Sequence, residues 1–429
     1  MEPRTRLEAR GKLRGKVAVP PSKSYTHRAV VMASLSEGTS RVSNPLISRD
    51  TLATVRACRA MGAKVEEDAG LVRVVGAEPA APDDVVNVDN SGTTLRFMTS
   101  VFSLAERGYT VLTGDVSTRR RPMQGLLDAL VALGGKARSA KGDGCAPIIV
   151  GEGGLTGGEA EVRGDVSSQF VSSILIASPL VKRDSTLRVV DAVSRPYIEA
   201  TMRLSELHEI EVHRDGYSKF DIPGSQKYRA CDFVVPGDFS SASFLMAAVA
   251  LVGGEVELSG LTTTLPQGDV AILDMLRRMG VEVNAGQSSV VVAADGERLK
   301  GGRFDLSDTP DLLPVLSVLS LKCDSPVEIA GVAHARYKET DRINVAATEL
   351  SKIGVDVEER RDGMKISRPG KLTKGVLDAH NDHRMFMAFS LASILSHGEV
   401  EVLGEKSLDV SYPSFLGDMD KLGARVVRA

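Results

Sequence analysis

Basic and hydroxyl-bearing residues crowd one short stretch of the chain, PPSKSYTHR (20–28). The apolar residues before it predict a strand, the two prolines interrupt that strand, and the residues after them predict a helix start. A helix start offers unpaired backbone N–H groups and the positive end of the helix dipole. Lys23 and Arg28 beside it therefore favour an anion-binding site. The alternative interpretation is a helix that is simply capped at a wet surface.

Five later stretches are similar, because each follows a candidate strand, carries Ser, Thr, Asn or Asp, and precedes an apolar helix. They are DNSGTTLRFM (89–98), GDVSSQFVSS (164–173), GDFSSASFLM (237–246), SDTPDLLPVL (307–316) and HNDHRMFMAF (380–389). The corresponding positions Ser24, Gly92, Ser168, Ser241, Asp311 and Asp382 are separated by 68, 76, 73, 70 and 71 residues. This spacing predicts six units of about 71 residues, each a βαβ-type module with extra strands.

A second repeated pattern consists of a helical stretch, an apolar residue, a glycine and a short strand. It occurs as RACRAMGAKV (56–65), LLDALVALGGKA (126–137), LDMLRRMGVEV (273–283), ATELSKIGVDV (347–357) and GDMDKLGARV (417–426). We expect each glycine to end its helix in the left-handed conformation. A degenerate copy, MRLSELHEIEV (202–212), lacks the glycine.

Six modules in 429 residues favour two domains of three modules each. We place the first domain at residues 20–236 and the second at 1–19 together with 237–429, with hinges near residues 20 and 236. If the modules are oriented alike and the domains face each other, six helix starts point into one cleft.

Further cations form the clusters STRRRPMQG (117–125), VSRPY (193–197) and ARYKETDR (335–342). Arginine binds phosphate or carboxylate oxygens in pairs, which favours small anions with several charges. Asp311 and Glu339 stand among these groups. One interpretation is structural: the Asp311 carboxylate would interact favourably with a helix dipole, and Glu339 would pair with Arg342. The other interpretation is functional, because carboxylates beside fixed cations can transfer protons.

Composition excludes several classes of protein. The net charge of −3, the 4% aromatic content and the absence of Trp argue against a nucleic-acid-binding protein. The four scattered cysteines and seven histidines show no metal-ligand spacing, and neither a GxxxxGK[ST] nor a clean GxGxxG motif occurs. No apolar run could span a membrane and no signal peptide is evident, so we expect a cytoplasmic protein with reduced thiols.

The chain resembles the 5-enolpyruvylshikimate-3-phosphate synthase family, which acts one step before chorismate on the route to the aromatic amino acids. The resemblance rests on PSKSYTHR, NSGTTLR, GDVSSQF, VSRPYI, GDFSSAS, SDTPD, KETDRI and NDHRM, in this order. It implies a two-domain inside-out α/β fold with six βαβαββ repeats, three per domain, in which the N-terminal strand completes the second domain. It also implies transfer of the enolpyruvyl group of phosphoenolpyruvate to the 5-hydroxyl of shikimate 3-phosphate, with release of phosphate.

The resemblance carries site roles to individual positions. Lys23, Asp311 and Glu339 would be catalytic: Asp311 would act on the 5-hydroxyl and Glu339 on the enol carbon. The shikimate 3-phosphate site would comprise Lys23, Ser24, Arg28, Ser167, Ser168, Gln169, Ser194, Tyr197, Asp311, His334 and Lys338. The phosphoenolpyruvate site would comprise Lys23, Asn90, Gly92, Arg121, Gln169, Arg342 and Arg384. The family implies a monomer without metal or cofactor, inhibited by glyphosate at the phosphoenolpyruvate site.

The sequence departs from the family at three positions: Val410 stands where many members have lysine, His334 where an asparagine is usual, and Phe97 where some have proline. Lys406 could take the place of the missing lysine. One alternative is the related enolpyruvyl transferase acting on UDP-N-acetylglucosamine, which normally has a cysteine in the loop that reads STRRRPM here. The other is a polyanion-binding protein on the same kind of repeat scaffold.

Overall fold

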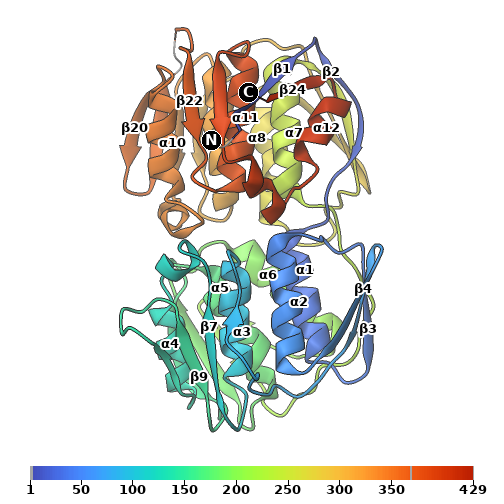
Figure 1. The fold of residues 1–429 in the computed structure, drawn as a ribbon, viewed down its shortest axis with the longest axis vertical. Helices are drawn as coiled ribbons and strands as arrows, with labels where there is room; N and C mark the ends of the chain where they lie inside the picture. The colour runs from blue at the N-terminus through green and yellow to red at the C-terminus, as the bar shows by residue number, and fades with distance from the viewer. Residues whose placement is uncertain (1–2, 368–369, 429) are drawn as a thin grey trace. The chain divides into compact units, whose positions relative to one another are not determined.

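The computed structural model describes residues 3–367 and 370–428. The chain divides into two compact units, unit 1 with Met1–Pro20 and Gly237–Ala429, and unit 2 with Pro21–Pro236 (Figure 1). The division falls after Pro20 and after Pro236, beside the positions at which the sequence analysis placed hinges. That these positions act as hinges stays a prediction.

Six four-stranded sheets are present in the described part of the chain, three in each unit. In unit 2 their strand orders are β14 (Phe233–Val234), β3 (Thr39–Ser43), β5 (Leu71–Val75), β4 (Lys64–Asp68); β6 (Val86–Asn87), β7 (Tyr109–Thr113), β9 (Ile148–Gly151), β8 (Ala137–Ser139); and β10 (Gly158–Arg163), β11 (Ser185–Val190), β13 (Lys219–Ile222), β12 (His213–Asp215). In unit 1 they are β2 (Leu13–Ala18), β15 (Gly254–Ser259), β17 (Ser289–Ala294), β16 (Glu282–Ala285); β18 (Gly302–Asp305), β19 (Val327–Ala330), β21 (Gly363–Ser367), β20 (Asp356–Arg360); and β22 (Gly375–Asp378), β23 (Val400–Leu403), β1 (Thr5–Ala9), β24 (Ala424–Arg428).

All six sheets share one topology. The first two strands of each sheet run parallel, and the remaining two pair antiparallel to their neighbours. In four sheets a helix connects the two parallel strands, and in five a hairpin supplies the last two strands. The exceptions are β14 with β3, β2 with β15, and β1 with β24, whose strands come from distant parts of the chain. The prediction of six βαβαββ units, three per domain, is confirmed.

Two N-terminal strands belong to unit 1. Strand β2 pairs parallel with β15, and β1 lies between β23 and β24. Strand β14, which precedes the return of the chain to unit 1, takes the corresponding place beside β3 in unit 2. The N-terminal segment therefore completes the second domain, as the family resemblance implied.

The helices that begin at the six polar stretches are the most buried elements. They are α1 (Lys23–Ser34), α3 (Gly92–Phe102) and α5 (Ser168–Ala177) in unit 2, and α7 (Phe239–Val252), α9 (Leu313–Leu319) and α11 (His383–Leu395) in unit 1 (Figure 1). Helix α7 is buried from Phe239 to Leu251, and α11 from His383 to Ile394. A helix that is apolar all round belongs inside a domain, whereas the strands alternate between buried and exposed residues.

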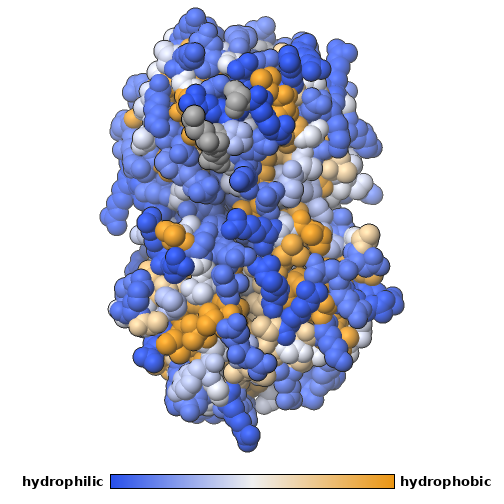
Figure 2. Space-filling model, in the orientation of Figure 1, coloured by the Kyte–Doolittle hydropathy of each residue, from blue (hydrophilic) through white to orange (hydrophobic). Residues whose placement is uncertain are grey.

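The second helix of each module lies nearer the surface. These helices are α2 (Arg49–Met61), α4 (Gln124–Ala132), α6 (Arg195–Leu207), α8 (Ile272–Arg278), α10 (Arg342–Ser351) and α12 (Phe415–Lys421). Short 3₁₀ turns η1 (Thr118–Arg120), η2 (Ser178–Leu180), η3 (Gly268–Ala271), η4 (Pro310–Leu312), η5 (Ser320–Lys322), η6 (Ala333–Tyr337) and η7 (Glu405–Val410) complete the modules. Figure 2 shows a face on which hydrophilic residues predominate and hydrophobic residues form small patches.

The repeated glycines adopt the predicted left-handed conformation. Their φ angles are +116° at Gly62, +87° at Gly134, +96° at Gly280, +84° at Gly354 and +104° at Gly423.

In the degenerate copy, Glu209 takes the glycine position with φ +60°. The fold therefore imposes the same backbone turn even where the sequence lacks the residue that adopts it without strain.

No helix among the described residues is both long and apolar enough to cross a membrane.

Candidate active site

The predicted capping of the central helices is present. Side-chain oxygens of Ser22, Ser91, Ser167 and Asp382 accept hydrogen bonds from backbone N–H groups in the first turns of α1, α3, α5 and α11. At α7 the carboxamide of Gln267 does this from outside the helix, accepting from Phe239 N at 3.2 Å. The caps hold the helix starts rigidly, so the cations near them have defined positions.

In unit 2, Arg28 joins three helices. It is 2% exposed, and it donates to Thr201 Oγ1 at 2.8 Å, to Tyr197 O at 2.9 Å and to Ser24 O at 3.0 Å. Burial lowers the pKa of Arg28 to about 10. The guanidinium also lies 5.2 Å from the centre of the Phe97 ring. Three residues assigned to shikimate 3-phosphate, Ser24, Arg28 and Tyr197, are thus brought together.

Lys23 lies one turn before Arg28 on α1. Its Nζ is 3.2 Å from Asp50 Oδ2, and the Asp50 side chain is 3% exposed against 12% for Lys23. Asp50 is in the first turn of α2, where a carboxylate is favoured by the helix dipole. Asp50 was not predicted as a site residue; its place in the first turn of a helix was the only signal in the sequence.

Gln169 connects α5 with α3. Its Oε1 accepts from Arg96 Nη1 at 2.7 Å, and its Nε2 donates to Thr93 Oγ1 at 2.9 Å. Arg96 lies in the polar stretch DNSGTTLRFM (89–98) and was not predicted to have a role. From the first turns of α3, Arg96 holds the carboxamide of Gln169 in position. Ser167 and Ser168 begin the same helix α5, and Ser194 is the left-handed N-cap residue of α6.

Asn90, Gly92 and Arg121, all assigned to phosphoenolpyruvate, meet at the start of α3. Asn90 Nδ2 donates to Asp115 Oδ2 at 2.7 Å, in the loop that carries Arg121. Arg121 donates to Ser117 Oγ at 3.3 Å, and its Nη1 lies so close to Gly92 that a Cβ there would be 2.3 Å away. A side chain at position 92 would therefore displace the guanidinium of Arg121.

A buried hydrogen-bond chain supports that helix start. His27 Nδ1 is 2.6 Å from Thr54 Oγ1, Thr54 Oγ1 is 2.6 Å from Thr94 Oγ1, and Thr94 Oγ1 is 2.6 Å from Ser91 Oγ. Burial, with help from Lys23 and Arg28, lowers the pKa of His27 well below its usual value, so the imidazole is neutral. The chain ties α1 and α2 to the cap of α3.

In unit 1, Arg342 collects three carboxylates. Its Nε lies 2.7 Å from Asp382 Oδ2, its Nη1 2.7 Å from Asp311 Oδ1, and its Nη2 2.8 Å from Glu339 Oε2. The guanidinium is 1% exposed. The i,i+3 pair of Glu339 with Arg342, one of the two interpretations drawn from the sequence, is present. Asp382 had served only to mark the repeat, and it is now the most buried member of the group.

Asp311 contacts two further cations, Arg384 Nη2 at 3.1 Å and Lys338 Nζ at 3.6 Å. Burial by itself would raise the pKa of Asp311, but Arg384, Lys338 and Arg342 outweigh it and hold the pKa well below its usual range. Burial lowers the pKa of Lys338, against the pull of Asp311. His334 is buried in η6, which packs against η4 with Asp311.

These contacts divide the candidate residues into two groups. The unit 2 group surrounds the starts of α1, α3, α5 and α6, and the unit 1 group surrounds η4, the start of α10 and the start of α11. Both groups present fixed cations at helix N-termini, which suits phosphate and carboxylate groups. The described residues include no cluster of three or more His, Cys, Asp or Glu side chains arranged to hold a metal ion.

Comparison with known proteins identifies the family. Residues 7–419 match the family model of EPSP synthase (3-phosphoshikimate 1-carboxyvinyltransferase). The chain belongs to this family. It is 48% identical over 422 residues to the 3-phosphoshikimate 1-carboxyvinyltransferase of Methanothermobacter thermautotrophicus, covering 98% of both chains, and 41% identical over 421 residues to that of Methanocaldococcus jannaschii, covering 97% of both.

Solved structures agree with the EPSP synthase fold. EPSP synthase from Acinetobacter baumannii superposes with a TM-score of 0.82 at 27% identity, covering all of both chains. The enolpyruvyl transferase NikO from Streptomyces tendae superposes with a TM-score of 0.78 at 18% identity, covering 100% of this chain and 99% of that one, a likeness of fold alone. The two-domain enolpyruvyl transferase fold is therefore confirmed.

The structure gives reasons for two departures from the EPSP synthase family pattern. Phe97 is fully buried and its ring packs against the guanidinium of Arg28, a residue assigned to shikimate 3-phosphate. Val410 is buried at the end of η7, whereas Lys406 in the same turn is exposed. A substitute role for Lys406 stays a prediction.

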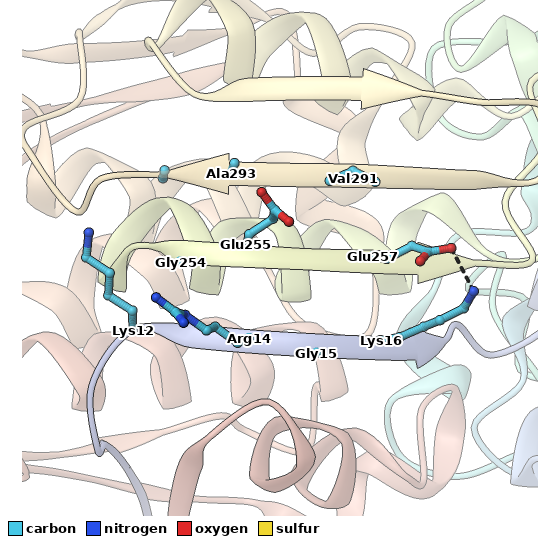
Figure 3. A pocket seen from close by; sticks show the side chains of 10 residues that line it. Lys12, Arg14, Gly15, Lys16, Gly254, Glu255, Glu257, Val291 and Ala293 are labelled. Atoms are coloured by element: carbon cyan, nitrogen blue, oxygen red, sulfur yellow. Dashed lines mark hydrogen bonds and ion pairs between the residues drawn. The ribbon is translucent and has the colours of Figure 1, made fainter.

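A hollow of about 580 Å³ lies elsewhere on unit 1, over strands β2, β15 and β17 (Figure 3). Arg14 and Lys16 line it from β2, Lys12 from just before that strand, and Glu255 and Glu257 from β15. Lys16 pairs with Glu257 at 2.7 Å across the two strands. None of the residues assigned to the EPSP synthase site lines this hollow.

Proposed function

We propose that this protein transfers the enolpyruvyl group of phosphoenolpyruvate to the 5-hydroxyl of shikimate 3-phosphate. Its relatives at 40–48% identity bear the name of that enzyme. The observation that carries the proposal is the group around Asp311, where two acids and three cations converge in one buried place. Such an arrangement suits a reaction between two anions that also moves protons.

The two anionic substrates repel each other and need fixed positive charge to approach. We assign the phosphate of shikimate 3-phosphate to Lys23, Arg28 and Lys338, with Ser24, Ser167, Ser168, Gln169, Ser194, Tyr197 and His334 around its ring and phosphate. We assign phosphoenolpyruvate to Arg121, Arg342 and Arg384, with Lys23, Asn90, Gly92 and Gln169 beside it. Arginine forks match the planar carboxylate and the phosphate oxygens, which supports this division.

The addition step needs a base and an acid. Asp311 accepts the proton of the 5-hydroxyl while that oxygen bonds to C2 of phosphoenolpyruvate. Glu339 gives a proton to C3, which becomes a methyl group in a tetrahedral intermediate. In the elimination step the proton returns from C3 to Glu339, the C2–O bond to phosphate breaks, and phosphate leaves with the proton that Asp311 took from the 5-hydroxyl.

The charge around Asp311 supports this role as base. In the protein without substrate, Arg384, Lys338 and Arg342 keep Asp311 ionised. Bound phosphate and carboxylate groups neutralise part of that positive charge, so the pKa of Asp311 rises when the substrates bind. Asp311 is therefore a stronger proton acceptor once the reacting hydroxyl is present. No step in this scheme requires a cofactor or metal ion.

A phosphate-release assay tests the proposal. Release of inorganic phosphate should require shikimate 3-phosphate and phosphoenolpyruvate together, and Asp311→Asn should lower kcat by at least about 100-fold. The matched control is Asp308→Asn in the same loop, which should leave kcat within about twofold of the parent. Release with UDP-N-acetylglucosamine in place of shikimate 3-phosphate, or binding of RNA without any release, would support the alternatives and refute the proposal.

Three finer statements belong to the same proposal. Glyphosate competes with phosphoenolpyruvate, the chain acts as a monomer, and it works in the cytoplasm. The close approach of Arg121 to Gly92 supports the first, because it places a guanidinium, which binds carboxylate and phosphate oxygens, at the start of α3. Competition kinetics and sedimentation equilibrium test the first two statements, and fractionation of cells tests the third.

A further inference from the structure

Glu349 is a buried carboxylate on α10 and is not one of the residues assigned to the EPSP synthase site. Its side chain is 1% exposed. From the same helix, Lys352 Nζ donates to Oε1 at 2.8 Å and to Oε2 at 2.7 Å. From another segment, Asp378 N donates to Oε2 at 3.0 Å, and His380 Nε2 lies 3.0 Å from Oε1. An ionised carboxylate only accepts hydrogen bonds, so His380 is the donor in that pair.

These hydrogen bonds keep Glu349 ionised. Burial by itself would raise the pKa of Glu349, but the hydrogen bonds from Lys352, Asp378 N and His380 outweigh burial and lower the pKa. A buried charge is tolerated only where its oxygens are hydrogen-bonded. Two of the donors belong to the turn 378–382, so the carboxylate ties this turn to α10.

Two residues on one face of α10 hold the turn 378–382. Arg342 and Glu349 are seven residues apart, which is about two helical turns and places them on the same side of the helix. Arg342 donates to Asp382 Oδ2 from Nε at 2.7 Å and to Oδ1 from Nη2 at 3.2 Å. Glu349 accepts from Asp378 and His380 at the other end of the turn. Strand β22 ends at Asp378 beside α10, so the connection from β22 to α11 is held against one helix (Figure 1).

The backbone of this turn is strained. His380 and Asn381 are consecutive residues other than glycine in the left-handed conformation, with φ +50° and +61°. Such residues are costly and persist only where the surrounding structure holds them. Asp378 Oδ1 accepts from His380 N at 2.7 Å, and Glu349 holds the His380 ring. The Glu349 carboxylate therefore supplies part of the restraint that the turn needs.

The turn leads directly into the anion-binding residues of unit 1. Asp382 is the N-cap of α11, and its Oδ1 accepts from Arg384 N at 2.9 Å. Arg384 follows in the first turn of α11, where its Nη2 lies 3.1 Å from Asp311 Oδ2. The first turn of a helix has no preceding helical carbonyls to bind its N–H groups, so the cap restrains it. A displaced turn would therefore displace Asp382 and Arg384.

We infer that Glu349 is a positioning residue that sets the place of Arg384 through the turn 378–382, with His380 as its partner. Without this restraint the turn relaxes toward ordinary backbone angles, and the start of α11 moves with it. Glu349 acts through the turn and touches no substrate. The inference rests on the proposed function in one respect, since it takes phosphoenolpyruvate as the anion that Arg384 binds.

The first experiment measures KM for both substrates by phosphate release in Glu349→Gln and His380→Ala. Gln replaces one accepting oxygen with an NH₂ group that faces a donor, and Ala removes the donating ring. A displacement of about 1 Å in a positioning group can cost up to 100-fold, so we expect KM for phosphoenolpyruvate to rise about tenfold in each variant. KM for shikimate 3-phosphate should stay within about twofold, since none of its assigned residues lies in the turn. A merely structural role would not give this split, because unfolded molecules lower kcat without changing KM.

Two further replacements of His380 separate positioning from stability. His380→Gln keeps an N–H donor at a similar reach, so KM for phosphoenolpyruvate should return to within about threefold of the parent value. His380→Gly removes the ring and also the left-handed side chain, so its urea midpoint should lie above that of His380→Ala, while its KM stays equally raised. The His380 side chain is 46% exposed, so these variants test the inference even if Glu349→Gln fails to fold.

The matched control is Asn381→Gly, in the same turn. Asn381 is exposed and left-handed like His380, but its replacement leaves the hydrogen bonds of Glu349 in place. KM for phosphoenolpyruvate should therefore stay within about twofold of the parent value.

Three results would overturn the inference: unchanged KM for phosphoenolpyruvate in Glu349→Gln and His380→Ala, equal rises for both substrates, or a recovery of KM together with stability in His380→Gly. Equilibrium dialysis with phosphoenolpyruvate alone measures the same ratios without turnover. A parent protein that binds phosphoenolpyruvate with these ratios but releases no phosphate would overturn only the proposed function. Phosphate release with flat ratios would overturn only the inference, and a parent that neither binds nor consumes phosphoenolpyruvate would overturn both.

Discussion

The replacement Gly92→Ala tests the phosphoenolpyruvate site at a single atom. Gly92 is the first residue of α3, so its backbone is helical and accepts alanine. The added Cβ would lie 2.3 Å from Arg121 Nη1, 3.3 Å from Cζ and 3.4 Å from Cδ. Since an ordinary carbon contact is about 3.5 Å, the end of the guanidinium must move by about 1 Å.

This movement should change function far more than stability. Arg121 donates only a 3.3 Å hydrogen bond to Ser117 from Nη2, and its Nε lacks a partner in the described chain, so the side chain swings at little cost. The free energy of unfolding should change by less than about 0.5 kcal/mol. A displacement of about 1 Å in a group that positions substrate can cost up to 100-fold, so we expect KM for phosphoenolpyruvate to rise about tenfold. The inhibition constant of glyphosate should rise at least as much.

The assay is steady-state phosphate release at varied phosphoenolpyruvate, with and without glyphosate. Gly125→Ala is the matched control: it also adds a methyl group in the first turn of a helix, but its Cβ would meet Phe170 at an ordinary 3.7 Å. Arg121→Ala and the double variant with Gly92→Ala complete a cycle, in which the two effects should not add. Unchanged KM and unchanged inhibition in Gly92→Ala, or fully additive effects, would refute the reasoning.

Three further variants test other parts of the molecule. Lys23→Met should lower phosphate release by at least about 100-fold while the circular dichroism spectrum stays native; unfolding would instead give Lys23, with its partner Asp50, a structural role. Asp382→Asn keeps the cap of α11 but removes a buried charged partner of Arg342, so the free energy of unfolding in urea should fall by about 3 kcal/mol. A fall of less than about 1 kcal/mol would contradict a large contribution of this ion pair to stability. Glu209→Gly should raise the free energy of unfolding by about 1 kcal/mol, because glycine adopts the left-handed conformation without strain. Glu209→Ala keeps the Cβ and should leave the free energy of unfolding unchanged. Equal effects of the two replacements would mean that the loss of the Glu209 charge is responsible.

Features governed by local rules could be predicted from the sequence. The helix starts followed from Ser, Asp and Asn before apolar runs, and the structure has caps at Ser22, Ser91 and Ser167. The left-handed glycines followed from their place after each helix. Glu209 is instructive, because the sequence showed only that this copy lacks the glycine, and yet the structure places Glu209 in the same left-handed turn. Six copies of one pattern carry more information than any single residue propensity.

Partners distant in sequence could not be predicted from the residues alone. Strand β14 is only two residues long and pairs with β3, which lies about 190 residues earlier; no periodicity reveals so short a strand. The place of β1 and β2 in unit 1 came only from the family resemblance. Likewise, Asp50 and Asp382 each pair with a site cation through the packing of two helices, and their sequence context is that of ordinary helix-cap residues.

The contacts of Arg342 bear on how the unit 1 group would receive an anion. An arginine has five N–H donors, and four hydrogen bonds join Arg342 to Asp382, Asp311 and Glu339. At most one donor stays available without breaking a buried ion pair, whereas Arg384 has an Nη1 that no described residue engages. We therefore expect Arg384 to be the first ligand for phosphoenolpyruvate and Arg342 mainly to hold Asp382, Asp311 and Glu339 in place. On this reasoning Arg384→Lys should raise KM more than it lowers kcat, while Arg342→Lys should do the reverse.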